Sequence, residues 1–98
     1  MTKVIFKGNL ITVKNHSGYK KVGEDIVCSS ISSVVFFLKE YFMINGINYE
    51  YEENQDIPMI RISIPDEKIL KASKSFFKKL AVDYKKYVEV VEENKWTN

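Results

Sequence analysis

The sequence predicts one α+β domain across residues 1–98, in which two helices pack on one side of a mixed or antiparallel sheet. Two observations predict this fold: short runs of β-branched and aromatic residues, and two longer segments with apolar residues at helical spacing. Together they give the order ββαββαβ. A hydrophobic fraction of 45%, with six Tyr and six Phe, excludes a disordered chain.

The first two elements are strands joined as a hairpin. Residues 4–6 and 10–13 are rich in β-branched and aromatic side chains. Gly8 and Asn9, which follow Lys7 between the two runs, tolerate a positive φ and therefore predict a tight turn. A polar segment then extends to residue 24.

The third element is a helix, which we expect to begin at Asp25. Its carboxylate can accept a hydrogen bond from a backbone N–H of the first turn, so Asp25 is the expected N-cap and Cys28 the third helical residue. Gly46 is placed to end the helix. Apolar residues recur between these ends at a spacing near 3.6, namely Val27, Ile31, Val34, Val35, Leu38 and Phe42.

The next two elements are half-buried strands. Apolar and polar residues alternate over residues 47–51 and again over residues 60–64. The turn between them falls around residues 54–56, and Pro65 stops the second strand.

The last elements are a helix and a short strand. Asp66 and Glu67 favour a helix start, because acidic side chains interact favourably with the N-terminal end of the helix dipole. The inner side of this helix carries Ile69, Ser73, Phe76, Phe77, Leu80 and Tyr84. Residues 87–91 predict the final strand, and residues 92–98 a frayed tail.

Most site chemistries are disfavoured by residue counts and spacing. One His and one Cys, with no second pair at ligand spacing, predict no metal site within the chain. Gly18 and Gly23 are not followed by the Lys-Ser/Thr of a phosphate-binding loop, and we expect no cofactor. The carboxylate pairs at residues 52–53 and 92–93 lie in turn and tail contexts, which are typical of a solvated surface.

The only cysteine, Cys28, lies twelve residues after the only histidine, His16. A helix N-terminus and a nearby imidazolium both lower the pKa of a thiol, which favours the reactive thiolate. The pattern therefore suggests a nucleophile and its base, with backbone N–H groups beside Cys28 to hold an oxyanion. Cys28 could equally be a small core residue. Ser32, one turn on, either bonds the thiol or a substrate carbonyl, or bonds back to its own helix.

A motif surrounds these two residues. It reads Gly23-x-Asp25-Ile26-Val27-Cys28-x-x-x-Ser32, with His16 twelve residues before the cysteine. The motif resembles the signature of the ribosomal-processing cysteine proteases, the Prp or YsxB-like family, whose members are also similar in length and element order. Asn15 and Ser17 stand where that family usually has Gly and Ala. Because Asn replaces Gly best where a positive φ is needed, we expect the turn before His16 to be kept.

The resemblance implies a cysteine endopeptidase. His16 would be the general base and Cys28 the nucleophile, supported by Gly23, Asp25 and Ser32. The implied substrate is the N-terminal extension of a large-subunit ribosomal protein, cleaved after a pair of aromatic residues, usually Phe-Phe.

The resemblance also implies a homodimer. Phe36, Phe37 and Tyr41 extend the apolar surface of the first helix beyond one stripe, and a helix apolar on more than one face needs a further covering surface.

Two alternatives to a peptidase stay open. Lys71, Lys74 and Lys78 recur on one face of the second helix, beside Lys68 and Lys79. Such a row can contact phosphates, so the chain could be a non-catalytic factor that binds a ribosomal protein or RNA. A net charge of +2 does not by itself imply nucleic acid, and solvated lysines are the usual outcome. A thiol redox sensor is disfavoured, because the chain has no second cysteine to resolve an oxidised thiol.

We expect a cytoplasmic protein with no membrane partner. The N-terminus lacks the apolar stretch of a signal peptide. The longest apolar run, residues 34–38, is far short of a membrane span. A single cysteine cannot form an intrachain disulfide, so nothing indicates an oxidising compartment.

Overall fold

The structure, a computed structural model, describes residues 1–15 and 22–93, with residues 22–25 described by their backbone alone. The elements follow the predicted order. They are β1 (Thr2–Lys7), β2 (Leu10–Lys14), α1 (Val22–Ile44), β3 (Tyr51–Asn54), β4 (Met59–Ser63), α2 (Glu67–Asp83) and β5 (Val88–Glu93).

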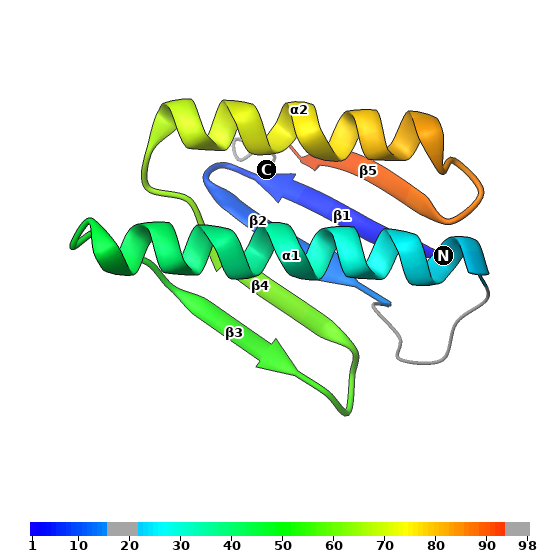
Figure 1. Cartoon of the computed structure of the whole chain (residues 1–98), viewed down its shortest axis with the longest axis horizontal. Coiled ribbons are helices and arrows are strands. Elements are labelled where there is room, and N and C mark those ends of the chain that lie inside the picture. Colours follow the sequence, from blue (N-terminus) through cyan, green and yellow to red (C-terminus); the bar gives the residue numbers. More distant parts are fainter. Residues whose placement is uncertain (16–21, 94–98) are drawn as a thin grey trace.

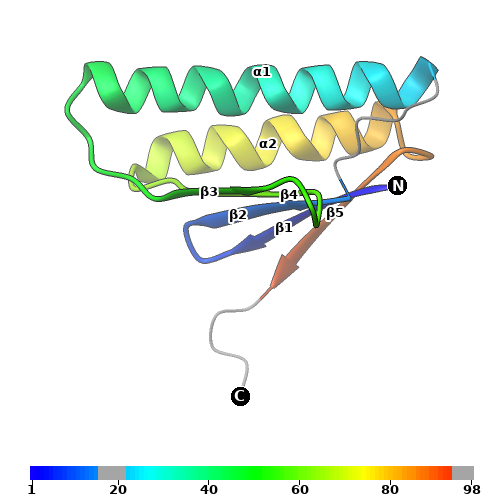
Figure 2. The same ribbon diagram turned by 90° about the horizontal axis from the view of Figure 1, so that it is seen from below.

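The strands form one five-stranded mixed sheet in the order β3-β4-β2-β1-β5. Strands β1, β2, β4 and β3 pair antiparallel, whereas β5 pairs parallel to β1. The two helices lie side by side on one face of this sheet (Figures 1 and 2). The predicted two-layer α+β fold is confirmed, and β3 and β5 are its edge strands.

The core lies between the sheet and the two helices. In β1 and β2, Val4, Phe6, Ile11 and Val13 point toward the helices and are almost fully buried. The ring of Phe6 meets that of Phe77 on α2 edge to face, with centroids 5.8 Å apart. Each such side chain stabilises the fold by about 1.5–3 kcal/mol relative to full exposure, so this layer fixes where the helices sit.

The turn residues behave as their types suggest. Gly8 takes a φ of 60° between β1 and β2, as a two-residue hairpin with glycine in its first position requires. Gly46, with a φ of 64°, ends α1. Its N–H donates to the Met43 carbonyl, and the Ile47 N–H donates to the Phe42 carbonyl at 2.8 Å. This is the Schellman arrangement, which pairs carbonyls of the last turn.

The start of α2 is fixed by a side-chain cap. Asp66 Oδ1 accepts a hydrogen bond from the Ile69 N–H at 2.9 Å, which makes Asp66 the N-cap, one residue before the helix. Ser73 is buried on the inner side as predicted, and its hydroxyl donates to the Ile69 carbonyl at 2.8 Å. The buried hydroxyl is therefore satisfied within its own helix.

Three predicted boundaries are wrong. Strand β5 runs to Glu93, so Glu92 and Glu93 belong to a strand and not to a frayed tail, and Glu52 and Glu53 lie in β3 and not in a turn. Strand β3 begins at Tyr51 and not at residue 47. The apolar side chains of Ile47 and Tyr49 pack against the core, but their segment does not pair with a neighbouring strand. Helix α1 begins at Val22, so Asp25 is not its N-cap and Cys28 is its seventh residue. Acidic side chains also favour the first helical turn, so the sequence pattern at Asp25 fits either position.

Helix α1 is long and apolar enough over Ile26–Ile44 to cross a membrane by length and composition, with a mean hydropathy of 1.5. The longest uninterrupted apolar run, residues 34–38, did not predict this property. Ser32 and Ser33 interrupt the apolar sequence, but they lower the mean hydropathy of the helix only slightly. Length and composition are weak evidence for a span, since the core helix of a soluble protein passes the same test. Val27, Ile31 and Phe42 on this helix are fully buried in the domain core.

Candidate active site

Cys28 lies in the second turn of α1, and its side chain is 5% exposed. The N–H groups of a helix that lack an intrahelical partner are those of its first turn. With α1 beginning at Val22, such N–H groups among the described residues belong to residues 22–24. The expectation that N–H groups directly beside Cys28 hold the oxyanion is therefore wrong. N–H groups in the second turn of a helix already donate hydrogen bonds to carbonyls of the first turn.

His16 lies outside the described residues. Gly23 and Asp25 are described by their backbone alone, which lies in the first turn of α1. The described elements that flank this segment are β2 and α1, and the end of β2 and the start of α1 lie at the same end of the molecule (Figure 1). Asn15 has a φ of 62°, which confirms the expectation that it takes the conformation a glycine would take.

One side of α1 continues from Cys28 along the helix. Ser32, Val35 and Lys39 follow Cys28 at intervals of four, three and four residues, which places all four on one stripe. A surface hollow of about 260 Å³ opens along this stripe, between α1 and strands β3 and β4. Its lining consists of Ser32, Val35, Phe36, Lys39, Tyr51, Glu53 and Ile60. The hollow therefore begins about 6 Å along the helix axis from the cysteine.

The rim of the hollow is polar, and its side chains contact one another. The Lys39 Nζ lies 3.8 Å above the centroid of the Tyr51 ring, and the Tyr51 hydroxyl donates to Glu53 Oε1 at 2.9 Å. Burial raises the pKa of Tyr51 to about 12, with the hydrogen bond and charge of Glu53 adding to the effect. Tyr51 therefore stays a neutral hydrogen-bond donor across the pH range in which a peptidase works.

The sequence interpretation missed Lys39, Tyr51 and Glu53. The available signal was the spacing of Tyr51 and Glu53, which as i and i+2 residues of a strand share one face. Local residue spacing does not predict that α1 lies over this face of the strand.

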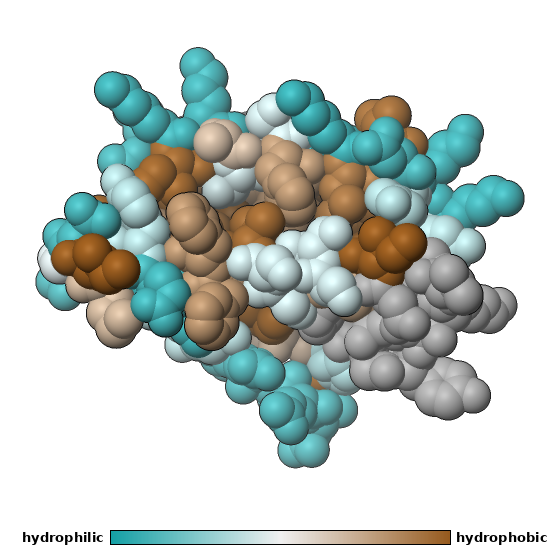
Figure 3. All heavy atoms as spheres, viewed as in Figure 1, coloured by the Kyte–Doolittle hydropathy of each residue, from teal (hydrophilic) through white to brown (hydrophobic). Residues whose placement is uncertain are grey.

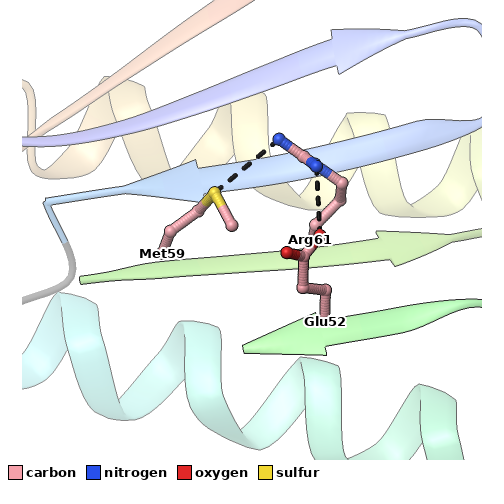
Figure 4. Close-up of polar contacts among 3 residues, drawn as sticks. All are labelled: Glu52, Met59 and Arg61. Atoms are coloured by element: carbon pink, nitrogen blue, oxygen red, sulfur yellow. Dashed lines mark hydrogen bonds and ion pairs between the residues drawn. The ribbon is translucent and has the colours of Figure 1, made fainter. Parts of the chain in front are cut away.

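Glu52 lies on the other face of the sheet. Its Oε1 pairs with Arg61 Nη1 at 3.1 Å, and Arg61 Nη2 donates to the Met59 sulfur at 3.7 Å (Figure 4). The Glu52 side chain is exposed, as expected for a surface carboxylate. Among residues 1–15 and 26–93, whose side chains the structure describes, His, Cys, Asp and Glu form no group of three that could hold a metal ion.

The family model of the cysteine protease Prp matches residues 1–89. The chain belongs to this family. A curated relative, the ribosomal processing cysteine protease Prp of Mycoplasma genitalium, is 32% identical over 66 residues. That match spans 67% of this chain and 65% of the relative, just under two thirds of its length.

Solved structures of the family share the fold. Prp from S. aureus in complex with a substrate peptide has a TM-score of 0.79 and 16% identity, covering 95% of this chain and all of that one. The same enzyme with a covalently linked product peptide gives 0.74 at 19% identity, with the same coverage. SMU.848 from Streptococcus mutans gives 0.72 at 17% identity, covering 95% of this chain and 92% of that one. These likenesses confirm the fold class of this family member.

Proposed function

We propose that this chain is a cysteine endopeptidase that removes the N-terminal extension of a large-subunit ribosomal protein, cleaving after a Phe-Phe-like aromatic pair. One observation carries the proposal: in a chain that the Prp family model matches over residues 1–89, the only cysteine lies on the helical stripe that continues into a hollow. The relative from S. aureus binds a substrate peptide and a covalently linked product peptide, which supports the same chemistry here.

The reaction is acyl transfer through a Cys28–His16 dyad. A ring nitrogen of His16 takes the thiol proton, and the thiolate attacks the scissile carbonyl. The tetrahedral intermediate collapses to a thioester as the imidazolium gives its proton to the leaving amine. A water molecule, deprotonated by His16, then hydrolyses the thioester to release the carboxylate product and restore the thiol.

Gly23, Asp25 and Ser32 support this dyad from α1. Gly23 and Asp25 belong to the first turn, in which the N–H groups of residues 22–24 have no acceptor within the helix. Those groups, and not ones beside Cys28, are the helix donors available to an oxyanion. Ser32 lines the end of the hollow one helical turn from Cys28 and would bond a substrate carbonyl.

The hollow next to Ser32 would hold a side chain of the substrate. Its floor is apolar, formed by Val35 and Ile60 with the ring of Tyr51. An extended peptide advances about 3.3 Å per residue, so the hollow lies about two residues from the scissile bond. An aromatic residue of the cleavage motif fits the apolar character of this floor.

Burial of Cys28 leaves a core role as the competing explanation. The pH dependence of alkylation separates the two. A nucleophile paired with His16 reacts with iodoacetamide well below pH 8.5, the pKa of an ordinary thiol. A core cysteine scarcely reacts at any pH until the protein unfolds, and that result would overturn the proposal.

We also propose that the protein is a cytoplasmic homodimer. The outer side of α1 exposes a row of large apolar side chains, with Phe37 67% and Ile44 77% exposed. A groove of about 410 Å³ between α1 and α2 adjoins it, lined by residues that include Phe37, Tyr41 and Phe76. Figure 3 shows this apolar surface between the two helices. Exposed patches of this kind commonly mark subunit contacts. Sedimentation velocity that gives a monomer at micromolar concentration would refute the dimer.

A further inference from the structure

Helix α2 carries a row of lysines along its outer side, one of which, Lys68, also borders the groove between α1 and α2. This α2 lysine face consists of Lys68, Lys71, Lys74, Lys78 and Lys79. The row borders two adjoining surface hollows of about 650 and 420 Å³, and Lys71 and Lys74 line both. Hydrophilic side chains project along this edge of the molecule, beyond the apolar band between the helices (Figure 3).

The small net charge of the chain hides a strong separation of charge. Residues 67–86 contain seven lysines and two acidic residues, whereas residues 40–66 contain six acidic residues and one arginine. The acidic segment includes β3 and β4, and α2 lies at the opposite edge of the domain (Figure 1). The lysines are therefore concentrated on α2 and the turn that follows it, although the neighbouring strand β5 carries Glu89, Glu92 and Glu93 and the whole chain carries only +2.

Part of this positive charge is not neutralised by neighbouring side chains. Glu92 of β5 pairs with both Lys74 and Lys78, with N–O distances of 3.4 Å. Its side chain is about half exposed, so solvent screens these pairs. Among the residues that the structure describes, Lys68, Lys71 and Lys79 form no ion pair.

The shape and chemistry of the face favour a phosphate backbone. The row from Lys68 to Lys79 is held straight by the helix and spans about 16 Å. The described residues that line its two hollows include no aromatic side chain on which an unpaired base could stack. Duplex RNA offers regular phosphate rows and is recognised mainly through its backbone and shape.

We propose that the α2 lysine face binds the backbone of double-stranded RNA without sequence preference. The hollow beside Cys28 lies between α1 and β3, so bound RNA would leave that side of the domain open to a peptide. RNA binding would place the enzyme on RNA-rich particles in which ribosomal proteins assemble. Only this last consequence rests on the proposed function, because the binding itself needs neither Cys28 nor His16.

Fluorescence anisotropy with a labelled RNA duplex of 16 base pairs tests the proposal at 50–200 mM KCl. Contacts from four or five lysines give a slope of about −4 in a plot of log K against log salt. The double variant Lys71→Gln/Lys79→Gln keeps both ion pairs to Glu92. It should bind at least about tenfold more weakly at 50 mM salt, with the slope reduced by about 2.

The matched control is Lys3→Gln/Lys14→Gln, which removes the same charge elsewhere. These two residues are register partners in β1 and β2, on the sheet face opposite to that of the buried Val4 and Val13. The control should bind RNA within about twofold of the unchanged protein. Equal losses in both double variants, or no RNA binding at all, would overturn the proposal.

Two further measurements keep this test separate from catalysis. Cys28→Ala should bind the duplex as the unchanged protein does, and Lys71→Gln/Lys79→Gln should cleave a free peptide at the normal rate. Loss of cleavage with RNA binding intact would count against the peptidase alone. Binding to phosphatidylglycerol vesicles without binding to the duplex would identify an anionic membrane as the partner and overturn the RNA proposal.

Discussion

Filling the hollow beside Cys28 should block the substrate without disturbing the fold. Ser32 is exposed at the edge of the hollow, so a phenylalanine at this position can occupy it without entering the core. If the hollow holds one apolar substrate side chain, its loss removes about 1.5–3 kcal/mol of binding. At 1.4 kcal/mol per factor of ten, Ser32→Phe should lower kcat/KM by roughly 10- to 100-fold.

The neighbouring serine supplies the control. Ser33 is equally an exposed serine of α1 but is turned about 100° around the helix and does not line the hollow. Ser33→Phe should keep kcat/KM within about twofold, and both variants should keep their unfolding midpoints, since surface substitutions change stability by about 0.5 kcal/mol or less. Ser32→Ala separates the effect of the lost hydroxyl from that of the added ring. Normal cleavage of a Phe-Phe peptide by Ser32→Phe, or an equal loss in Ser33→Phe, would refute this placement of the substrate.

Three further variants test the dyad, the helix cap and the hydrogen-bonded rim. His16→Ala should lower kcat strongly in peptide cleavage while leaving the thermal midpoint nearly unchanged; a large loss of stability with normal turnover would make His16 structural. Asp66→Ala removes the cap on the Ile69 N–H and should cost about 1 kcal/mol in urea unfolding, whereas Asp66→Asn should keep most of it. Because the pKa of Tyr51 is raised to about 12 in the folded protein, its contribution to stability is present below pH 10 and is lost as the pH rises through 12. When the pH is raised from 9 to 11.5, the free energy of unfolding in urea should therefore fall less for Tyr51→Phe than for the unchanged protein. An equal fall in both proteins would contradict the raised pKa of Tyr51.

The elements of this fold could be predicted because their signals are local. Hydrophobic periodicity identified both helices, and Gly8 and Gly46 marked turns that need a positive φ. The start of α1 was predicted wrongly because an acidic residue suits both an N-cap and a first turn, and only the path of the backbone decides between them.

The candidate site also contains some residues that the sequence could place and others that it could not. Cys28 and Ser32 could be placed on one helix face from their spacing alone. Lys39, Tyr51 and Glu53 lie together only because α1 packs over β3. A contact between segments that are distant in the sequence cannot be predicted from local residue spacing. The lysines of α2 were visible in the sequence, but their separation from the acidic edge depends on the order of the strands.

Cleavage by a cysteine-free variant tests the central claim most directly. Cys28→Ala suits this better than Cys28→Ser, because a hydroxyl in a buried apolar position would itself cost stability. The substrate is a peptide with the N-terminal extension of a large-subunit ribosomal protein and its Phe-Phe pair, and mass spectrometry identifies the products. The unchanged protein should cut once, after the aromatic pair, and Cys28→Ala with a normal circular dichroism spectrum should produce no detectable product. Cleavage by Cys28→Ala at the rate of the unchanged protein would contradict the account.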